Sequence, residues 1–359
     1  MMNARFLDLT EVPWDLLDRF GDRTVYQTRE WMNFLAESQR ARPVVAELRT
    51  GSEVAGYFTG LIVKRFGIRI LGSPFPGWTT PYMGFNLVDG ASRSEALDAV
   101  ERLAFGELKC LHMEISDRRF ALEVGEGLGF LPKIYDSYET DLRRSEAQIF
   151  GGMDSACRRC IRKAEKSGVI VQEAHDLEFA DDYYDQLKHV FGNRGLVPPY
   201  GVERVRALIQ HMLPTGRLLL VRALGPDGKC IATGIYPGFN KLAELWGNAS
   251  YRPSQILRPN QALHWYAMRY WKARGVEFLD WGGKGTYKEK YGPYAISVPR
   301  FRKSRLRIVA IMRDRAKTAV RLKQVLLGRF SGQNTGTEHS HGDGPDDHWQ
   351  ERELDVHKA

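Results

Sequence analysis

The sequence has few cysteines and no long apolar run, and each shortage excludes a class of protein. Four cysteines in 359 residues cannot form the disulfide framework of a small secreted scaffold. Cys157 and Cys160 form one C-x-x-C pair without a second pair at zinc-ligand spacing, so we expect no metal site. No stretch approaches the roughly 20 apolar residues that span a bilayer, and the first residues lack signal-peptide features. We therefore expect a cytoplasmic protein.

The composition is sufficient for two domains of ordinary size, because 359 residues exceed one average domain and 43% of them are apolar. The formal net charge of +8 is unevenly distributed. Residues 332–359 hold seven acidic and two basic residues, so this tail carries −5 and the rest of the chain +13. Its polar composition predicts disorder.

A basic segment precedes this tail. Between Arg300 and Arg329 there are eleven basic residues and one acid, and we expect a helix at 311–331. Such a segment can contact phosphate-rich partners, among them tRNA and the anionic inner face of the membrane. A solvated helix that packs by its apolar side explains the composition equally well.

One order of elements occurs twice. In the second half, apolar runs at 217–224, 230–239 and 242–250 are separated by turn residues and predict a three-stranded meander. A helical pattern at 259–275 and a strand at 276–283 follow. The first half repeats this order at 43–48, 54–67, 68–73, 92–106 and 110–116. We therefore predict an α/β protein with a mixed sheet in each of two domains, 1–150 and 151–310.

The segment between the halves predicts a basic helix that ends at Gly168. It contains Arg158, Arg159, Arg162, Lys163 and Lys166. A second helix is expected over 177–196.

Four pieces of the chain resemble a known family. The pieces are YQTREWMNFL, RRCIRKAEKSGV, NASYRPSQILRPNQALHWYAMRYWKARG and LDWGGKGTYKEKYG, in that order. Together they are similar to FemAB-type transferases and to the related GNAT acyltransferases of the BioF2-like kind. The resemblance implies two tandem GNAT-like domains, which agrees with the repeated element order.

The resemblance also implies an activity, the transfer of an acyl group to an amine. Fem-type enzymes take an amino acid from aminoacyl-tRNA and attach it to a peptidoglycan precursor, whereas ordinary GNAT enzymes take acetyl from acetyl-CoA. In both reactions an amine attacks an activated carbonyl and the developing oxyanion must be stabilised. No tightly bound cofactor is implied, because the donor is a substrate.

The loop before the central helix indicates which acyl donor the protein uses. GNAT enzymes hold the CoA pyrophosphate on a glycine-rich loop there, but YRPSQILRPNQAL contains no glycine and Pro259 lacks an N–H group. Arg252 and Arg258 are candidates for phosphate contact whichever donor is used, and a pair of plain surface arginines is the alternative. Asn260 is a further donor-side candidate.

The stretch DWGGKGTYKEKYG, residues 280–292, follows the last predicted strand of the repeat. The family pattern has an aromatic residue and a lysine before an aromatic-glycine ending, which Tyr287, Lys288, Tyr291 and Gly292 match. The resemblance thus implies that Lys288 neutralises phosphate or the oxyanion, with Tyr287 and Lys290 on the donor side. The glycines would let backbone approach a ligand. A solvated lysine cluster is the alternative.

Two carboxylates are candidates for the proton acceptor. Glu244 falls on the strand where GNAT enzymes often place such a group, and it needs partial burial to raise its pKa. A solvated edge position is the alternative. Asp280, at the end of the following strand, is the second candidate.

The acceptor side is expected in the first half. The loop from Ser73 to Asn86 is long and aromatic. In the resembling family this region helps form the acceptor cleft, so Trp78, Tyr82 and Lys64 are the candidates. Packing between domains is the alternative for these residues.

We therefore expect an N-acyltransferase that acts on an amine of a cell-envelope or small-molecule precursor, with aminoacyl-tRNA favoured as the donor. One alternative is an acyl-CoA-dependent N-acetyltransferase that acts on an amino sugar or polysaccharide precursor. Another is a non-catalytic basic module that binds RNA or anionic membrane.

Overall fold

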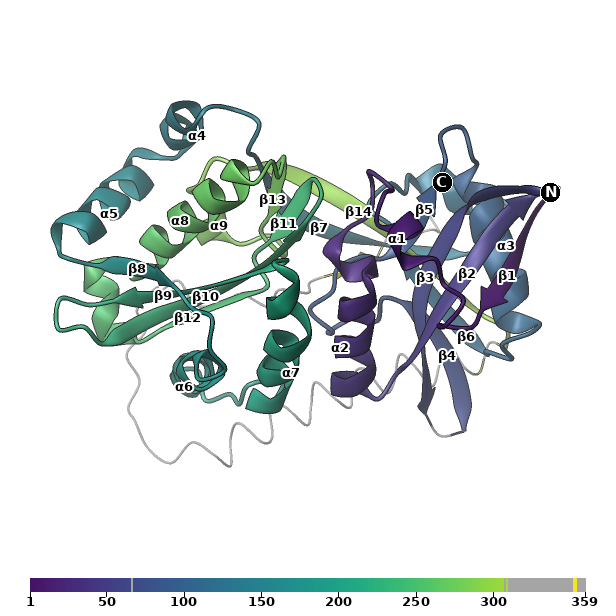
Figure 1. Cartoon of the computed structure of the whole chain (residues 1–359), viewed down its shortest axis with the longest axis horizontal. Helices are drawn as coiled ribbons and strands as arrows, with labels where there is room; N and C mark the ends of the chain where they lie inside the picture. The colour runs from purple at the N-terminus through teal and green to yellow at the C-terminus, as the bar shows by residue number, and fades with distance from the viewer. Residues whose placement is uncertain (66, 307, 309–350, 354–359) are drawn as a thin grey trace. The chain divides into compact units, whose positions relative to one another are not determined.

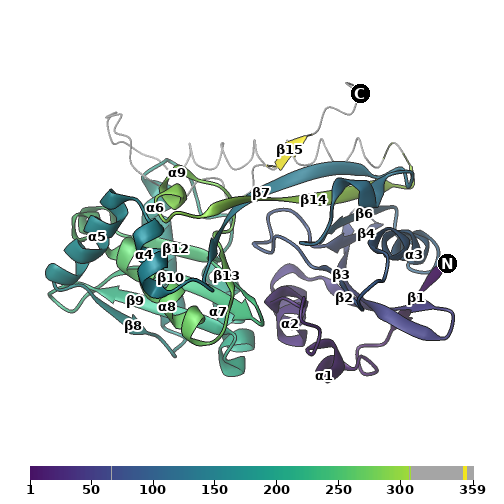
Figure 2. The ribbon, with the colours of Figure 1, turned by 90° about the horizontal axis from the view of Figure 1, so that it is seen from above.

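The structure is a computed structural model that describes residues 1–65, 67–306, 308 and 351–353. The described chain forms two compact units, which we treat separately (Figures 1 and 2). Unit 1 is Met1–Asp136 with the described residues from Ile296 onward, and unit 2 is Ser137–Ala295. This division differs from the expected boundaries at 150 and 310, because β7 (Leu131–Asp141) and β14 (Tyr294–Ser304) are each shared between the units.

The C-terminal predictions fall largely outside the described residues. This applies to the helix expected at 311–331 and to all of the tail except β15 (Glu351–Glu353), which pairs with β7.

Unit 1 is a mixed sheet in the order β1-β2-β3-β4-β6-β14, with β5 paired to β3. Its strands are β1 (Met2–Leu7), β2 (Arg42–Thr50), β3 (Glu53–Arg65), β4 (Ile68–Ser73), β5 (Gly84–Leu87) and β6 (His112–Ser116). Its helices are α1 (Trp14–Leu17), α2 (Arg29–Gln39) and α3 (Arg93–Phe105). All neighbouring pairs of β1 to β6 are antiparallel except β4 and β6. These two strands run parallel, because the connection between them is a crossover that includes α3.

Unit 2 repeats this arrangement. Its strands are β8 (Ile170–Glu173), β9 (Leu218–Leu224), β10 (Cys230–Phe239), β11 (Leu242–Glu244), β12 (Gly247–Ser250) and β13 (Phe278–Asp280). Its helices are α4 (Glu146–Gly152), α5 (Ser155–Lys166), α6 (Phe179–Gly192), α7 (Val202–Met212), α8 (Pro259–Ala273) and α9 (Thr286–Glu289). Strands β8 to β11 are antiparallel neighbours, and β11 runs parallel to β13 across the α8 crossover.

The predicted mixed α/β class is therefore confirmed, and both units contain the β-β-β-α-β order. The predicted strands differ clearly from the observed ones in two places. The strand expected at 276–283 is reduced to β13 (Phe278–Asp280). The run at 242–250 divides at Leu245 and Trp246 into β11 and β12, because β12 pairs with β10 and not with β13.

Helix α8 is the central helix of unit 2. Pro259 occupies its first turn, where a missing N–H group costs nothing, and Arg258 before it adopts a left-handed conformation with φ of 61°. Its buried face consists of Leu263, His264, Ala267, Met268 and Trp271. It packs on β9 and β10, whereas α6 packs on β10 and β12 from the opposite side (Figure 1). The sheet of unit 2 is thus covered on both faces.

Candidate active site

The parallel pair β11 and β13 ends in two carboxylates. Glu244 and Asp280 are the last paired residues, directly opposite each other. Beyond them the Leu245 N–H group still donates to the Asp280 carbonyl at 2.8 Å. The chain then continues as β12, which pairs with β10 alone. The two strands therefore separate at their carboxyl ends, the edge at which open α/β sheets place their ligands.

Strand alternation places these carboxylates on one face. Ala243, Leu245 and Leu279 belong to the core cluster that includes α8, so the residues between them point to the other side of the sheet. Strand β7 is the other neighbour of β13, and its residue Glu139 lies directly opposite Asp280. Glu139, Asp280 and Glu244 are 1%, 0% and 3% exposed, so three buried carboxyl groups form a row across three strands.

Asp280 is held by a small network in which its Oδ1 atom accepts two hydrogen bonds. The Ser137 hydroxyl donates to it at 2.6 Å and the Gly282 N–H group at 2.8 Å. The Gly283 N–H group in turn donates to the Ser137 hydroxyl at 2.8 Å. These N–H groups fix the position of Asp280, a use of the glycines that the sequence did not predict.

Gly282 is required by its conformation. Its φ is +66°, and a Cβ atom there would lie 2.7 Å from the Leu245 carbonyl oxygen. The loop after β13 therefore lies against the end of β11.

Glu244 has the properties expected of a proton acceptor. The alternative of a solvated edge position does not hold, because the residue is buried. Among the residues that the structure describes, its Oε2 atom has no hydrogen-bond partner. Burial raises the pKa of the Glu244 carboxyl well above its usual range, and the neighbouring negative charge of Asp280 raises that pKa further. The positive charge of Lys288 acts in the opposite direction.

Lys288 is buried in α9, at 0% exposure, and the alternative of a solvated lysine does not hold for it. Its Nζ atom donates to the Gly283 carbonyl at 3.2 Å and lies 5.6 Å from the centre of the Tyr287 ring. Lys284 in the same loop is exposed, and Lys290 is half-buried. Of the three lysines, Lys288 is therefore the one whose charge acts in the site.

A buried His264 and Tyr236 pair adjoins the site, and sequence reasoning missed it. His264 Nδ1 lies 2.7 Å from the Tyr236 hydroxyl, and His264 Nε2 is buried without a hydrogen-bond partner in the described part of the chain. Burial lowers the pKa of His264 to about 3, and the charge of Lys288 adds to the decrease. The ring also packs against Trp281 and Tyr291 at centroid distances of 5.3 Å each. The signal in the sequence was a histidine at a core-facing position of a helical pattern.

The predicted donor-side residues lie at the end of β12 and the start of α8. Arg252 and Arg258 are exposed in the short helix Arg252–Leu257 and its cap. Asn260 donates to the Ser250 hydroxyl at 3.2 Å, while its buried Oδ1 atom has no hydrogen-bond partner within the described ranges. These three residues follow β12, the strand that continues the chain beyond Glu244.

The predicted acceptor-side residues all belong to unit 1. Tyr82 is 1% exposed and packs edge-on against Tyr26, with ring centres 5.7 Å apart. Trp78 is half-buried against Phe75 at 4.8 Å, and Lys64 is exposed on β3. Tyr82 thus contributes to the interior of unit 1, and acceptor binding by the three residues stays a prediction.

The start of the basic C-terminal segment is a strand. Arg300 lies in β14 at 1% exposure and donates to the Pro81 carbonyl at 3.3 Å, so its side chain offers no surface charge. Residues 309–329 of the segment lie outside the described residues.

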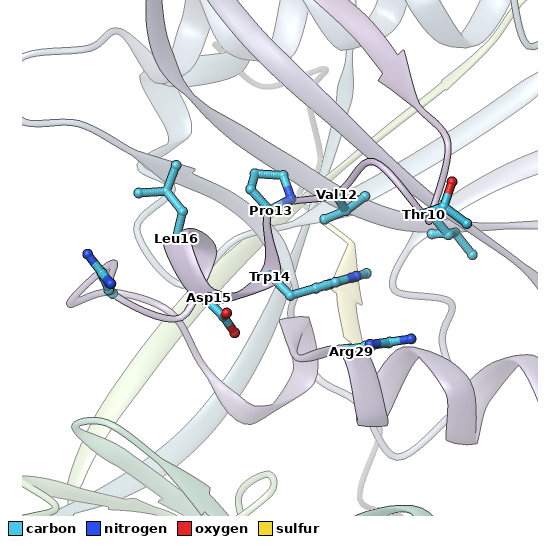
Figure 3. A pocket seen from close by; sticks show the side chains of 9 residues that line it. Thr10, Val12, Pro13, Trp14, Asp15, Leu16 and Arg29 are labelled. Carbon is cyan, nitrogen blue, oxygen red and sulfur yellow. The ribbon is translucent and has the colours of Figure 1, made fainter.

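A surface pocket of about 550 Å³ lies in unit 1, apart from the predicted site residues. Figure 3 shows its lining around Trp14, with Pro13 directly before α1, Leu16 on α1 and Arg29 at the start of α2. Within the described ranges no group of His, Cys, Asp and Glu side chains could hold a metal ion. None of the helices placed by the structure has the length and apolar character to cross a membrane.

Comparisons with known proteins agree with this arrangement. Residues 153–291 match the family described as the acetyltransferase (GNAT) domain. The solved structure described as FemX has 13% identity and a TM-score of 0.67, covering 82% of this chain and 96% of FemX. A conserved protein of unknown function from Bacteroides thetaiotaomicron has 12% identity and a TM-score of 0.50, covering 84% and 99%. No curated protein matches the chain.

The separating parallel strands β11 and β13 and the carboxylates Glu244 and Asp280 thus lie in the part of the chain that matches an acetyltransferase domain. The match at residues 153–291 includes Glu244, Asp280 and Lys288, whereas Ser137 and Glu139 lie before it. The coverage of FemX extends the shared fold to both units.

Proposed function

We propose that unit 2 transfers an acyl group to an amine at the end of β11 and β13. The observation that carries this proposal is the burial of Glu244 beside Asp280 and Lys288 at the point where the strands separate. A carboxylate whose pKa is raised toward neutral pH is an effective proton acceptor. A buried ammonium group stabilises a developing oxyanion more strongly than one in water.

The roles follow from these environments. The amine nitrogen attacks the carbonyl carbon of the donor, and Glu244 accepts the proton that the amine loses. Lys288 neutralises the oxyanion until the bond to the departing oxygen or sulfur breaks. Glu244 then returns its proton to that leaving atom. Asp280, fixed by Ser137 and Gly282, raises the pKa of Glu244 and so acts as a positioning residue.

Aminoacyl-tRNA is the donor that we favour, in keeping with the resemblance to Fem-type enzymes. The loop between β12 and α8 has no glycine, and Pro253 and Pro259 remove two N–H groups that could bind a pyrophosphate. Exposed Arg252 and Arg258 supply side-chain contacts to phosphate in their place. The acceptor on this proposal is an amine of a cell-envelope or small-molecule precursor.

An acyl-CoA donor is the second candidate. The matched family is described as an acetyltransferase domain, and its members in general use an acyl-CoA donor. On this alternative the acceptor is an amino sugar or a polysaccharide precursor. The same carboxylates and lysine would act on a thioester in place of an ester.

Thermal unfolding with different donors tests the proposal. We would compare acetyl-CoA, bulk aminoacyl-tRNA, deacylated tRNA and no ligand. A ligand at about 100 times its Kd stabilises the folded protein by roughly 2.7 kcal/mol. We expect aminoacyl-tRNA to stabilise wild type more than deacylated tRNA does, and Lys288→Met to lose this difference. Lys241→Met, at the opposite end of β11, is the matched control. Stabilisation by acetyl-CoA alone would assign the acyl-CoA donor.

A further inference from the structure

Helix α5 has four basic side chains on one exposed face. The first of these is Arg159. Arg162, Lys163 and Lys166 lie three, four and seven residues further along, which places all four side chains on the same side of the helix. All four are exposed. We call these four residues the α5 stripe. The neighbouring Arg158 is not part of it, because its guanidinium donates to the carbonyls of Gly151 and Met153.

The stripe is not neutralised within the described chain. None of its four side chains forms an ion pair or a hydrogen bond there, although Arg162 lies over the Phe150 ring at 5.2 Å. The helix contains one acid, Glu165. Like charges three and four residues apart repel each other and destabilise a helix. A stripe of this kind therefore costs stability unless an anionic partner neutralises it.

The opposite face of α5 anchors the helix in the core of unit 2. Cys157, Ile161 and Ala164 are buried in the cluster that includes α8, and α5 packs alongside α8 (Figure 1). Burial raises the pKa of the Cys157 thiol to about 12, so this thiol is unreactive and contributes only to core packing. Because the apolar face is occupied, α5 has nothing to insert into a bilayer as an interfacial helix does.

The start of α5 is joined to the candidate site. Asp154, the residue that caps the helix, donates its N–H group to the Lys290 carbonyl at 2.9 Å, two residues from Lys288. Gly292 packs so closely on the Gly152 carbonyl that a Cβ atom there would lie 2.2 Å away. The start of α5 is therefore held by the residues that directly follow α9, the helix that carries Lys288.

We propose that the α5 stripe binds the phosphate backbone of an RNA donor while its acylated end occupies the site at Glu244. This inference rests on the proposed function and adds to it the surface that holds the donor. Seven residues of helix rise about 10 Å, so the stripe presents four cations over a length that includes several backbone phosphates. Arginine and lysine contacts of this kind fix a nucleic acid in position and carry no sequence information.

The test is the salt dependence of tRNA binding. We would measure the Kd for bulk deacylated tRNA between 50 and 200 mM salt, because each phosphate contact contributes a slope of roughly 0.7 to 0.9 in log K against log salt. The stripe variant is R159Q/R162Q/K163Q/K166Q. The matched control removes four cations of unit 2 that have acidic partners, K188Q/R206Q/K229Q/K241Q.

We expect the stripe variant to lose about three units of slope and at least about tenfold in affinity, and the control to resemble wild type. Its melting temperature should equal or exceed that of wild type, because repulsion is removed. Vesicles of phosphatidylcholine with phosphatidylglycerol serve as the membrane probe. Equal tRNA binding by wild type and stripe variant would overturn the inference, and so would a loss of vesicle binding with tRNA binding retained.

The two proposals fail in different ways. If wild type binds no tRNA and transfers acetyl from acetyl-CoA, the donor assignment and the stripe inference fall together. If wild type transfers an aminoacyl group and the stripe variant does so with an unchanged KM for aminoacyl-tRNA, only the stripe inference falls. A raised KM with unchanged kcat in the stripe variant supports it, because the stripe contacts the donor away from the reacting atoms.

Discussion

Glu244 and Asp280 are direct neighbours across the parallel pair of β11 and β13, and both are buried. Two carboxylates in this position cannot ionise independently, so the charge of Asp280 adds to burial in raising the pKa of Glu244. Asp280 accepts hydrogen bonds from Ser137 and Gly282, whereas Glu244 Oε2 accepts none from any described residue. The environments of the two groups therefore differ, and so do the roles that we propose for them. Glu244 accepts the proton, and Asp280 raises the pKa of Glu244.

Replacing Glu244 tests the proton acceptor. We expect Glu244→Gln to lower kcat by about 10²- to 10⁴-fold, the usual contribution of a general base, because the amide cannot accept the amine proton. Unfolding in urea should show no loss of stability, since glutamine has the same shape and carries no buried charge. Glu277→Gln, a half-buried partner of Lys241 on the same unit, is the control and should retain activity.

Replacing Lys288 tests the electrostatics of the site. The charge of Lys288 opposes the rise of the Glu244 pKa, so Lys288→Met should raise that pKa further. The carboxylate form then exists only at higher pH, and the acid limb of the kcat/KM profile should move to higher pH. A profile that keeps its acid limb at the wild-type position would show that Lys288 and Glu244 do not interact.

Asp280→Asn should move the same limb in the other direction. The asparagine retains an oxygen that accepts from Ser137 and Gly282 but lacks the negative charge that raises the Glu244 pKa. We expect the acid limb of kcat/KM to shift to lower pH by a measurable fraction of a unit or more. Opposite shifts in Lys288→Met and Asp280→Asn would identify Glu244 as the titrating group. A shift in the same direction in both variants contradicts the assignment.

His264 predicts a loss of stability in acid. Its pKa is about 3 in the folded protein and about 6.5 when unfolded, so the unfolded state binds more protons between these values. Stability contributed by the neutral imidazole is therefore complete above pH 6.5 and decreases as the pH falls toward 3. At pH 5 the loss is about 2 kcal/mol.

The measurement is the free energy of unfolding in urea at pH 5 and pH 8. The double variant Tyr236→Phe/His264→Phe removes both partners of the buried hydrogen bond, so the decrease in unfolding free energy that His264 causes at pH 5 should be absent. Tyr236→Phe alone retains the histidine and should show this decrease. An equal difference between pH 5 and pH 8 in all three proteins would show that His264 does not titrate in this range. Glu244 contributes the opposite slope, because its raised pKa favours the folded state at low pH.

The local patterns of the sequence predicted most of unit 2. Turn residues at 225–229 and 240–241 bound strands of the expected kind, and Pro259 and Gly275 bracket α8 as helix signals should. The division of 242–250 was not predictable, because it depends on which neighbour each half finds. Helix α7 was not predicted, although Val205, Leu208 and Met212 have helical spacing.

The geometry of the candidate site was predictable in part. The family pattern and the positions at strand ends made Lys288, Glu244 and Asp280 candidates, and the structure places Glu244 directly opposite Asp280. Ser137 and Glu139 could not be linked to them, because they lie about 140 residues away in sequence and approach through the pairing of β7 with β13. No local pattern encodes a contact of that separation. The use of Gly282 and Gly283 to hold Asp280 likewise became visible only in three dimensions.

The most direct test of the central claim is the transfer of a labelled amino acid. Bulk aminoacyl-tRNA charged with radiolabelled amino acids would be incubated with amino sugars and lysine-containing peptides as amine acceptors, and with wild type or Glu244→Gln. We predict label in an acceptor with wild type and a decrease of at least about a hundredfold with Glu244→Gln. Equal transfer by the two proteins would contradict the assignment of the site at the end of β11 and β13.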